Sequence, residues 1–212
     1  MTLRVLLADD HRLMREGLRA LLRSVADVEV VGEVSTGREA QRLARELNPD
    51  VILMDVAMPD LNGIEAARAI HARCPSIRIA MLSMHATAEY VFRAFEAGAC
   101  GYLLKEMASQ EVITAVRTLQ EGKRYLSPAL AQILPAIAAG RARSPVESLS
   151  PRERQVLQLV VEGHSSSEIA RMIHLSPKSV ETYRSRLMAK LGVGDLASLV
   201  KFALEHGLTS PK

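Results

Sequence analysis

Acidic, hydroxyl and ammonium side chains occur in this sequence at the points where short apolar runs end. Asp9 and Asp10 follow the first run, Asp55 follows the third, and Ser83 and Lys105 follow the last two. Clustered carboxylates would repel one another, and a hard divalent cation such as Mg²⁺, which prefers oxygen ligands, would relieve that repulsion. A hydroxyl and an ammonium group beside them could hold the oxygens of a phosphoryl group. These residue types therefore predict Mg²⁺-assisted phosphoryl transfer.

Five apolar runs would position these groups. Each is short, rich in Val, Ile and Leu and bounded by polar residues, which is typical of buried parallel strands. The runs are residues 3–8, 28–34, 51–54, 77–82 and 101–104. Stretches with helical spacing separate them, so we expect an α/β fold with a doubly wound five-stranded parallel sheet of order 2-1-3-4-5. Ligands of such sheets bind beyond the carboxyl ends of the strands, where the polar residues should meet.

Each polar residue also has an ordinary interpretation. Asp10 could cap a helix, Ser83 could simply end a strand, and Lys105 could be a solvated surface lysine. Their convergence at one sheet edge favours a functional site.

Charge is unevenly distributed along the 212 residues. Residues 1–122 contain 14 Lys and Arg against 17 Asp and Glu, whereas residues 148–212 contain 9 against 6. This asymmetry suggests a cation site in the front half and an anionic partner for the back half. No apolar stretch approaches the roughly 20 residues that cross a bilayer. The N-terminus enters a strand and not a secretion signal, so we expect a cytoplasmic protein with no membrane partner.

The front half resembles the receiver domain of bacterial response regulators. The resemblance covers residues 1–122 and rests on four motifs: Asp9-Asp10, Met54-Asp55-Val56-Ala57-Met58-Pro59, Met81-Leu82-Ser83 and Gly101-Tyr102-Leu103-Leu104-Lys105. Glu106 stands where many receivers have Pro, so a cis peptide bond there is not expected.

The resemblance implies a role for each motif residue. Asp55 would be the phosphoacceptor, taking the phosphoryl group from a phosphohistidine of a sensor histidine kinase. Asp10, Asp55 and the backbone carbonyl of Ala57 would bind Mg²⁺ directly, and Asp9 would contribute through water. Ser83 would turn toward the new phosphate, Lys105 would hold its oxygens, and Tyr102 would rotate inward as a switch.

Two other functions share this sheet or this chemistry. A haloacid-dehalogenase-like phosphatase also forms an aspartyl phosphate, but it requires Asp-x-Asp after the first strand, whereas Asp9 and Asp10 are adjacent. A flavodoxin-like cofactor binder would need a phosphate loop rich in Ser, Thr and Gly after that strand, and none follows it.

A segment of linker composition, residues 123–147, follows the front half. Ser127-Pro128 could open a short helix. Residues 138–145 are small and basic, and they are expected to act as a tether.

The back half has the pattern of four short helices. Ser150 with Glu153 and Ser165 with Glu168 each form a capping-box pattern, and Pro177 follows a third capping serine. The tight turn before Pro177 predicts a small all-α helix-turn-helix domain over residues 148–212. Spacing alone also allows a helical protein-interaction domain.

Residues 148–208 resemble the LuxR-type DNA-binding domain. The resemblance rests on Leu149-Ser-Pro-Arg-Glu-Arg154, Glu168-Ile-Ala170, Leu175-Ser-Pro-Lys-Ser-Val180-Glu181 and Leu187-Met-Ala-Lys-Leu-Gly192. It implies that the third helix enters the major groove of double-stranded promoter DNA. The residues expected at phosphates are Lys178, Tyr183, Arg186 and Lys190, and those expected at bases are Glu181, Thr182 and Ser185. Ser179 is also expected to contact DNA.

The joined halves resemble a full-length NarL/FixJ-type response regulator. This implies a transcription factor without enzymatic activity beyond its own phosphorylation and autodephosphorylation, which forms a homodimer when phosphorylated. The dimer face could lie on the receiver helices or on the last helix, through Leu199 and Ala203. A regulator that binds DNA constitutively, with a receiver used only for protein contacts, remains an alternative.

Overall fold

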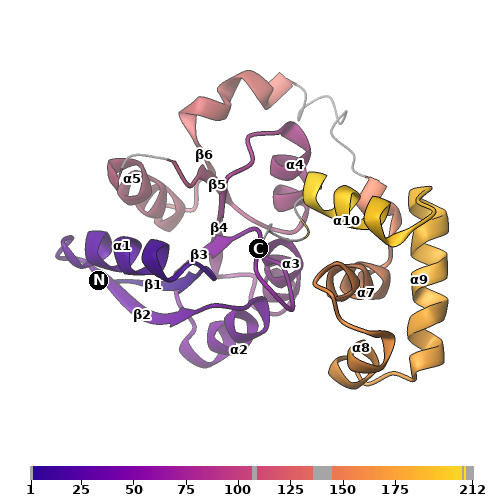
Figure 1. The fold of residues 1–212 in the computed structure, drawn as a ribbon. Coiled ribbons are helices and arrows are strands. Elements are labelled where there is room, and N and C mark those ends of the chain that lie inside the picture. The colour runs from indigo at the N-terminus through magenta and orange to yellow at the C-terminus, as the bar shows by residue number, and fades with distance from the viewer. Residues whose placement is uncertain (1, 107–108, 136–144, 207, 209–212) are drawn as a thin grey trace. The chain divides into compact units, whose positions relative to one another are not determined.

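The computed structural model describes residues 2–106, 109–135, 145–206 and 208, and it contains two compact units. These are Met1–Ala142 and Arg143–Lys212, and each is described by itself (Figure 1). The small basic segment expected to be a tether falls almost entirely on residues outside this description.

The first unit contains a parallel sheet of order β2-β1-β3-β4-β5-β6. Its strands are β1 (Leu3–Ala8), β2 (Val28–Val34), β3 (Val51–Asp55), β4 (Arg78–Ser83), β5 (Gly101–Leu104) and β6 (Tyr125–Leu126). The predicted fold class and the order of the first five strands are confirmed. The predicted number of strands is wrong by one, because the two-residue β6 is too short to show as an apolar run.

Helices cover both faces of this sheet. They are α1 (Arg12–Arg23), α2 (Gly37–Leu47), α3 (Gly63–Arg73), α4 (Ala88–Glu96) and α5 (Ser109–Gln120), followed by the 3₁₀ helix η1 (Pro128–Ile133). Successive strand residues face opposite sides. Leu7 and Leu53 therefore pack with α1 and α5, while Leu6 and Ile52 pack in a second core with α2, α3 and α4 (Figure 1).

Local capping fixes where several helices begin. The side chains of Thr36 and Asn62 accept hydrogen bonds from the amides of Glu39 and Glu65. Asn62 therefore starts α3 immediately after the loop that follows β3. The described peptide bonds are all trans.

The second unit is entirely helical. Its elements are η2 (Pro145–Ser148), α7 (Pro151–Val161), α8 (Ser166–Met172), α9 (Pro177–Leu191) and α10 (Leu196–Glu205). Both predicted capping boxes are present, at Ser150 and at Ser165. His174, with a φ of 55°, lies in the turn between α8 and α9. This is the predicted helix-turn-helix arrangement.

The core of the second unit overturns one expectation about dimerisation. Leu199 and Ala203 are fully buried, packed with Val156, Val180 and Leu187 from α7 and α9. They cannot form a dimer face unless the unit opens. Helical spacing identified an apolar stripe correctly, but this stripe closes the unit's own core.

Among the described residues, the helices are too short or too polar to cross a membrane.

Candidate functional site

The polar residues predicted from the strand ends meet at the carboxyl edge of the sheet. Asp9 and Asp10 follow β1, Asp55 is the last residue of β3, and Ser83 is the last residue of β4. Lys105 directly follows β5. The side chains of Asp9 and Asp55 are only 1% and 3% exposed. The sheet topology therefore brings together carboxylates that lie far apart in the sequence.

Lys105 neutralises part of this charge. Its Nζ atom lies 2.8 Å from Asp9 Oδ2 and 2.8 Å from Asp55 Oδ2. These contacts are ion pairs, and the two oxygens have no other hydrogen-bond partner among the described residues. One ammonium group does not neutralise two buried carboxylates, so the site could accommodate a further positive charge.

Burial sets the protonation behaviour of the site. It raises the pKa of Asp55 to about 7, although Lys105 acts in the opposite direction, and the Asp9 carboxylate adds to the rise. Burial also opposes the charge on Lys105, but Asp55 and Asp9 outweigh it and raise the pKa of that ammonium. The pocket therefore favours an added cation that would stabilise the ionised form of Asp55.

We expect the contribution of Asp55 to the stability of the cation-free protein to fall as the pH rises from about 4 to about 7. In this range Asp55 keeps its proton in the folded chain, whereas in the unfolded chain, with an ordinary pKa of 3.8, it loses it. Since the unfolded state binds fewer protons, raising the pH favours unfolding. Asp55→Asn removes this titration. The free energy of unfolding of the variant should therefore rise by a few kcal/mol relative to wild type between these two pH values. Urea unfolding at fixed pH with a chelator tests this, and parallel curves would contradict it.

His11 is part of the site, although sequence reasoning did not select it. Its Nδ1 atom lies 2.8 Å from Asp10 Oδ1 and 3.3 Å from Asp9 Oδ1. His11 is also the N-cap residue of α1, so the helix start holds the imidazole over the carboxylates. From the same helix, Arg15 Nη1 donates to the carbonyl oxygen of Asp9 at 2.5 Å. Adjacency to Asp10 was the only sequence signal for His11, and Arg15, six residues after Asp9, carried none.

The donor atoms of the pocket fit a hard divalent cation. One oxygen each from Asp9, Asp10 and Asp55, together with a nitrogen of His11, all lie within 4.8 Å of one another. Carboxylate oxygens at such separations match the preference of Mg²⁺ for oxygen ligands. The amide of Ala57 donates to Asp55 Oδ1 at 3.2 Å, which fixes the loop that follows β3 beside this cluster.

Ser83 and Tyr102 lie on one side of Asp55, in contact with the loop that follows β4. Ser83 is buried, and its Oγ atom accepts a hydrogen bond from the amide of His85 at 3.0 Å. Tyr102 is fully buried in an inward position, and its hydroxyl donates to the carbonyl oxygen of His85 at 2.8 Å. The His85 ring stacks on Tyr90 of α4, with ring centroids 4.3 Å apart. The loop residue His85 thus joins Ser83 and Tyr102 to α4.

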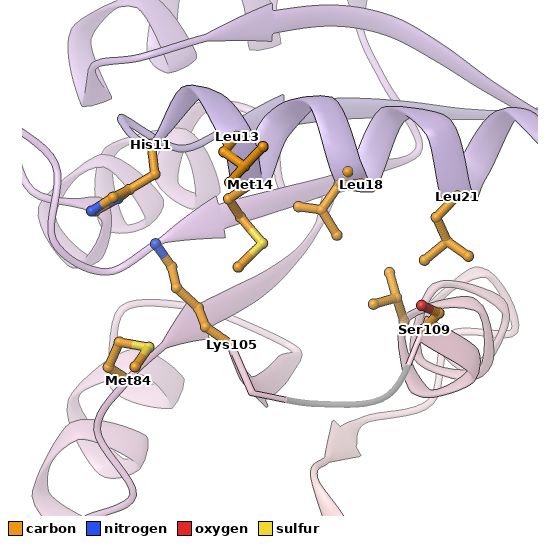
Figure 2. A pocket seen from close by; sticks show the side chains of 10 residues that line it. His11, Leu13, Met14, Leu18, Leu21, Met84, Lys105 and Ser109 are labelled. Atoms are coloured by element: carbon orange, nitrogen blue, oxygen red, sulfur yellow. The ribbon is translucent and has the colours of Figure 1, made fainter.

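An apolar hollow of about 640 Å³ opens beside the carboxylates, between α1 and α5. Figure 2 shows Leu18 and Leu21 pointing from α1 toward α5, while the Lys105 side chain borders the hollow at the end nearer His11. Leu13, at 83% exposure, and Met84, at 63%, lie on its rim. The charged pocket therefore has an apolar hollow directly beside it.

The third helix of the second unit, α9, presents most of its predicted contact residues to solvent. Those that are exposed are Lys178, Glu181, Thr182, Ser185, Arg186 and Lys190. Ser179 and Tyr183 are half-buried: Ser179 donates its amide to the capping Ser176 hydroxyl, and Tyr183 packs against the core.

Two of the exposed residues are bonded to other helices of their own unit. Lys190 Nζ lies 2.7 Å from Glu153 Oε2, and Glu181 accepts a hydrogen bond from Ser166. The structure therefore ties Lys190 to the start of α7 and Glu181 to α8. Lys178, Thr182, Ser185 and Arg186 form the exposed centre and margins of the helix face.

Comparison with known families identifies both units. The model described as "Response regulator receiver domain" matches residues 5–117, and the one described as "Bacterial regulatory proteins, luxR family" matches residues 147–203. The chain is similar over nearly all of its length to Response regulator UvrY of Escherichia coli (39% identity, covering 96% of this chain and 94% of UvrY). It is also similar to Response regulator GacA of Pseudomonas aeruginosa (36% identity, 97% of each chain).

Solved structures give the same result. RcsB of Salmonella typhimurium matches with 28% identity and a TM-score of 0.69, covering 97% of this chain and 98% of RcsB. RcsB bound to promoter P1flhDC in the presence of the phosphomimetic BeF₃⁻ matches with 28% identity and a TM-score of 0.67, covering 95% of this chain and 98% of RcsB.

Proposed function

Since this chain belongs to the LuxR-type two-component response regulators, we propose that Asp55 accepts the phosphoryl group that switches it between its states. The family controls transcription through a receiver and a DNA-binding domain. The observation that carries the assignment to Asp55 is its position: a buried carboxylate at the end of β3, 2.8 Å from the Lys105 ammonium. A sensor histidine kinase would be the phosphoryl donor.

The reaction is a direct transfer between two protein side chains. An Asp55 oxygen attacks the phosphorus of the kinase phosphohistidine, so that the O–P bond forms as the P–N bond breaks and the imidazole leaves. Lys105 would hold one phosphoryl oxygen, and the Ser83 hydroxyl would donate to another. The only other chemistry assigned to the chain is loss of this group to water.

Mg²⁺ is the cofactor that the donor set supports. When bound, it would neutralise the charge of the carboxylates and of the incoming phosphoryl oxygens. We assign its direct ligands to Asp10, Asp55 and the backbone carbonyl of Ala57, with Asp9 acting through water. The buried oxygens of Asp9 and Asp55 that have no hydrogen-bond partner among the described residues support this assignment.

We propose that residues 1–122 form the receiver, 148–212 the DNA-binding domain, and 123–147 their connection. In the second domain, α9 would enter the major groove of promoter DNA. The phosphate contacts would come from Lys178, Tyr183, Arg186 and Lys190, the base contacts from Glu181, Thr182 and Ser185, and a further DNA contact from Ser179. DNA as the partner would place the protein in the cytoplasm.

Phosphorylation would act by favouring a homodimer, because two recognition helices could then meet half-sites about one turn of DNA apart. RcsB supports this assignment, since one of its structures has two RcsB dimers bound to two DNAs. Tyr102 and Ser83 would report the phosphate to α4 through the loop at His85.

Peptide mapping after incubation with acetyl phosphate and Mg²⁺ tests the proposal. We expect the label on a peptide containing Asp55, together with an increase in solution mass and tighter binding of DNA. A labelled protein that stays monomeric and binds DNA with unaltered affinity would reject the switch.

Arg186→Ala should weaken DNA binding about 5- to 10-fold and reduce the slope of log affinity against log salt by about 1. The reason is that one exposed guanidinium would no longer displace a phosphate counterion. The measurement is a titration of a duplex selected by the wild-type protein from random sequences, at several salt concentrations. Arg23→Ala, which removes an exposed arginine from α1, is the matched control. Equal affinities for Arg186→Ala and wild type would remove Arg186 from the interface.

A further inference from the structure

The connection after α5 begins as part of the receiver sheet. β6 pairs in parallel with β5, with Tyr102 opposite Leu126. The amide of Tyr125 donates to the carbonyl oxygen of Cys100 at 3.0 Å, and the amide of Ser127 donates to that of Tyr102 at 3.0 Å. The strand that carries the switch tyrosine is therefore hydrogen-bonded on its outer edge to the connecting segment.

Ser127 is hydrogen-bonded to two elements, β5 and α5. It is 2% exposed. Its hydroxyl oxygen accepts a hydrogen bond of 3.4 Å from the amide of Leu104, and the hydroxyl donates to Glu111 of α5. Leu104 immediately precedes Lys105. One serine thus holds the backbone of β5 at Tyr102 and at Leu104, next to the lysine that pairs with Asp55.

The 3₁₀ helix η1 fixes Ser127 in this position. The amide of Leu130 donates to the carbonyl oxygen of Ser127 at 2.9 Å. Leu130 is 1% exposed and belongs to the same buried core as Tyr90 and Tyr102. Burial of the Leu130 side chain is favourable, and it keeps η1 packed against this core.

We infer that Ser127 is a positioning residue for Lys105 and Tyr102, acting through the backbone of β5. This inference rests on the proposed function. It makes the phosphorylation of Asp55 depend on a residue that lies outside the receiver motifs. It also means that the chain leading to the DNA-binding domain starts at a residue bonded to the switch strand. A displacement of Tyr102 would then move the start of this connecting segment directly.

The test compares phosphorylation rates in the full-length protein. Ser127→Ala should slow labelling of Asp55 by acetyl phosphate about 5- to 10-fold, because small misplacements of a catalytic group are costly. Ser127→Thr, which keeps the hydroxyl, should restore the rate to within about twofold. The control is Ser24→Ala: Ser24 is exposed, and its hydroxyl donates to the carbonyl oxygen of Leu21 at 2.6 Å. It should label at the wild-type rate.

Glu111→Ala provides a second route if the buried serine tolerates no change. It removes the acceptor that orients the Ser127 hydroxyl from a half-buried position on α5. We expect a smaller loss of rate, about 2- to 3-fold. In both Ser127→Ala and Glu111→Ala, the amide of Leu104 should exchange with solvent at least about 10-fold faster, while the amide of Leu6 in β1 is unchanged.

The outcomes separate this inference from the proposed function. A wild-type chain that takes no label at Asp55 would reject both. A labelled wild type, with a folded Ser127→Ala variant that is labelled equally fast, would reject only the positioning role. Unchanged exchange at Leu104 would show that the hydroxyl does not hold β5.

Discussion

Replacement of Asp55 with Asn should abolish phosphorylation, lowering label incorporation by at least about 1000-fold. The amide has nearly the same shape as the carboxyl group but is not a nucleophile, so the fold should survive. It should even become more stable at neutral pH, because burial raises the pKa of the carboxyl group to about 7 and its ionised form is costly to keep. Intact-mass measurement after treatment with acetyl phosphate and Mg²⁺ gives the labelled fraction.

Asp60→Asn is the matched control for this variant. Asp60 pairs with Arg38 at 2.6 Å, in the loop between β3 and α3 but outside the pocket. Its φ of 66° suits asparagine, so the backbone should tolerate the change. Asp60→Asn should be labelled as wild type is, whereas label retained by Asp55→Asn would place the acceptor elsewhere.

The same pair of variants tests the constitutive alternative. If phosphorylation is the switch, acetyl phosphate should tighten DNA binding by wild type and by Asp60→Asn but not by Asp55→Asn. If the receiver serves only for protein contacts, Asp55→Asn would leave solution mass and DNA affinity unaltered under all conditions.

Gly63→Ala should damage both stability and phosphorylation. A Cβ atom at Gly63 would lie 1.9 Å from the carbonyl oxygen of Asp55 and 2.9 Å from its carbonyl carbon. Both are backbone atoms, and Gly63 is held there by its amide, which donates to the carbonyl oxygen of Val56 at 2.8 Å. The start of α3 and the end of β3 must separate, at a cost of about 3 kcal/mol.

This separation would move the phosphoacceptor. We expect Gly63→Ala to reduce the rate of Asp55 labelling about 100-fold in the fraction of protein that remains folded, because the attacking oxygen is misaligned. Urea unfolding gives the stability, and the intact mass gives the label. A variant as stable and as reactive as wild type would show that the close contact between the start of α3 and the Asp55 backbone is not required.

Gly17→Ala is the control for the added methyl group. Gly17 lies in α1, and a Cβ atom there would meet nothing within 4 Å. Alanine at this position should stabilise the protein by about 0.5–1 kcal/mol, because it reduces the flexibility of the unfolded chain and favours the helix. Its labelling rate should equal that of wild type.

The sequence by itself determined the elements and the edge at which the site forms. The five apolar runs became β1 to β5, and the i, i+3 pairs at Ser150 and Ser165 became capping boxes. These patterns act over a few residues, so they can be read without knowing what lies nearby in space. Asp9, Asp55 and Lys105 could be expected to converge because parallel strands place their carboxyl ends at one edge.

Only the tertiary structure decided which atoms meet between elements. It added β6, placed His11 over Asp10, and brought Gly63 against the backbone of Asp55. It also turned Leu199 inward and paired Lys190 with Glu153, 37 residues away in sequence. Such contacts join segments whose spacing carries no periodic signal, because they depend on how complete elements pack. Local patterns therefore fixed the elements that carry the site, and packing fixed the neighbours that control it.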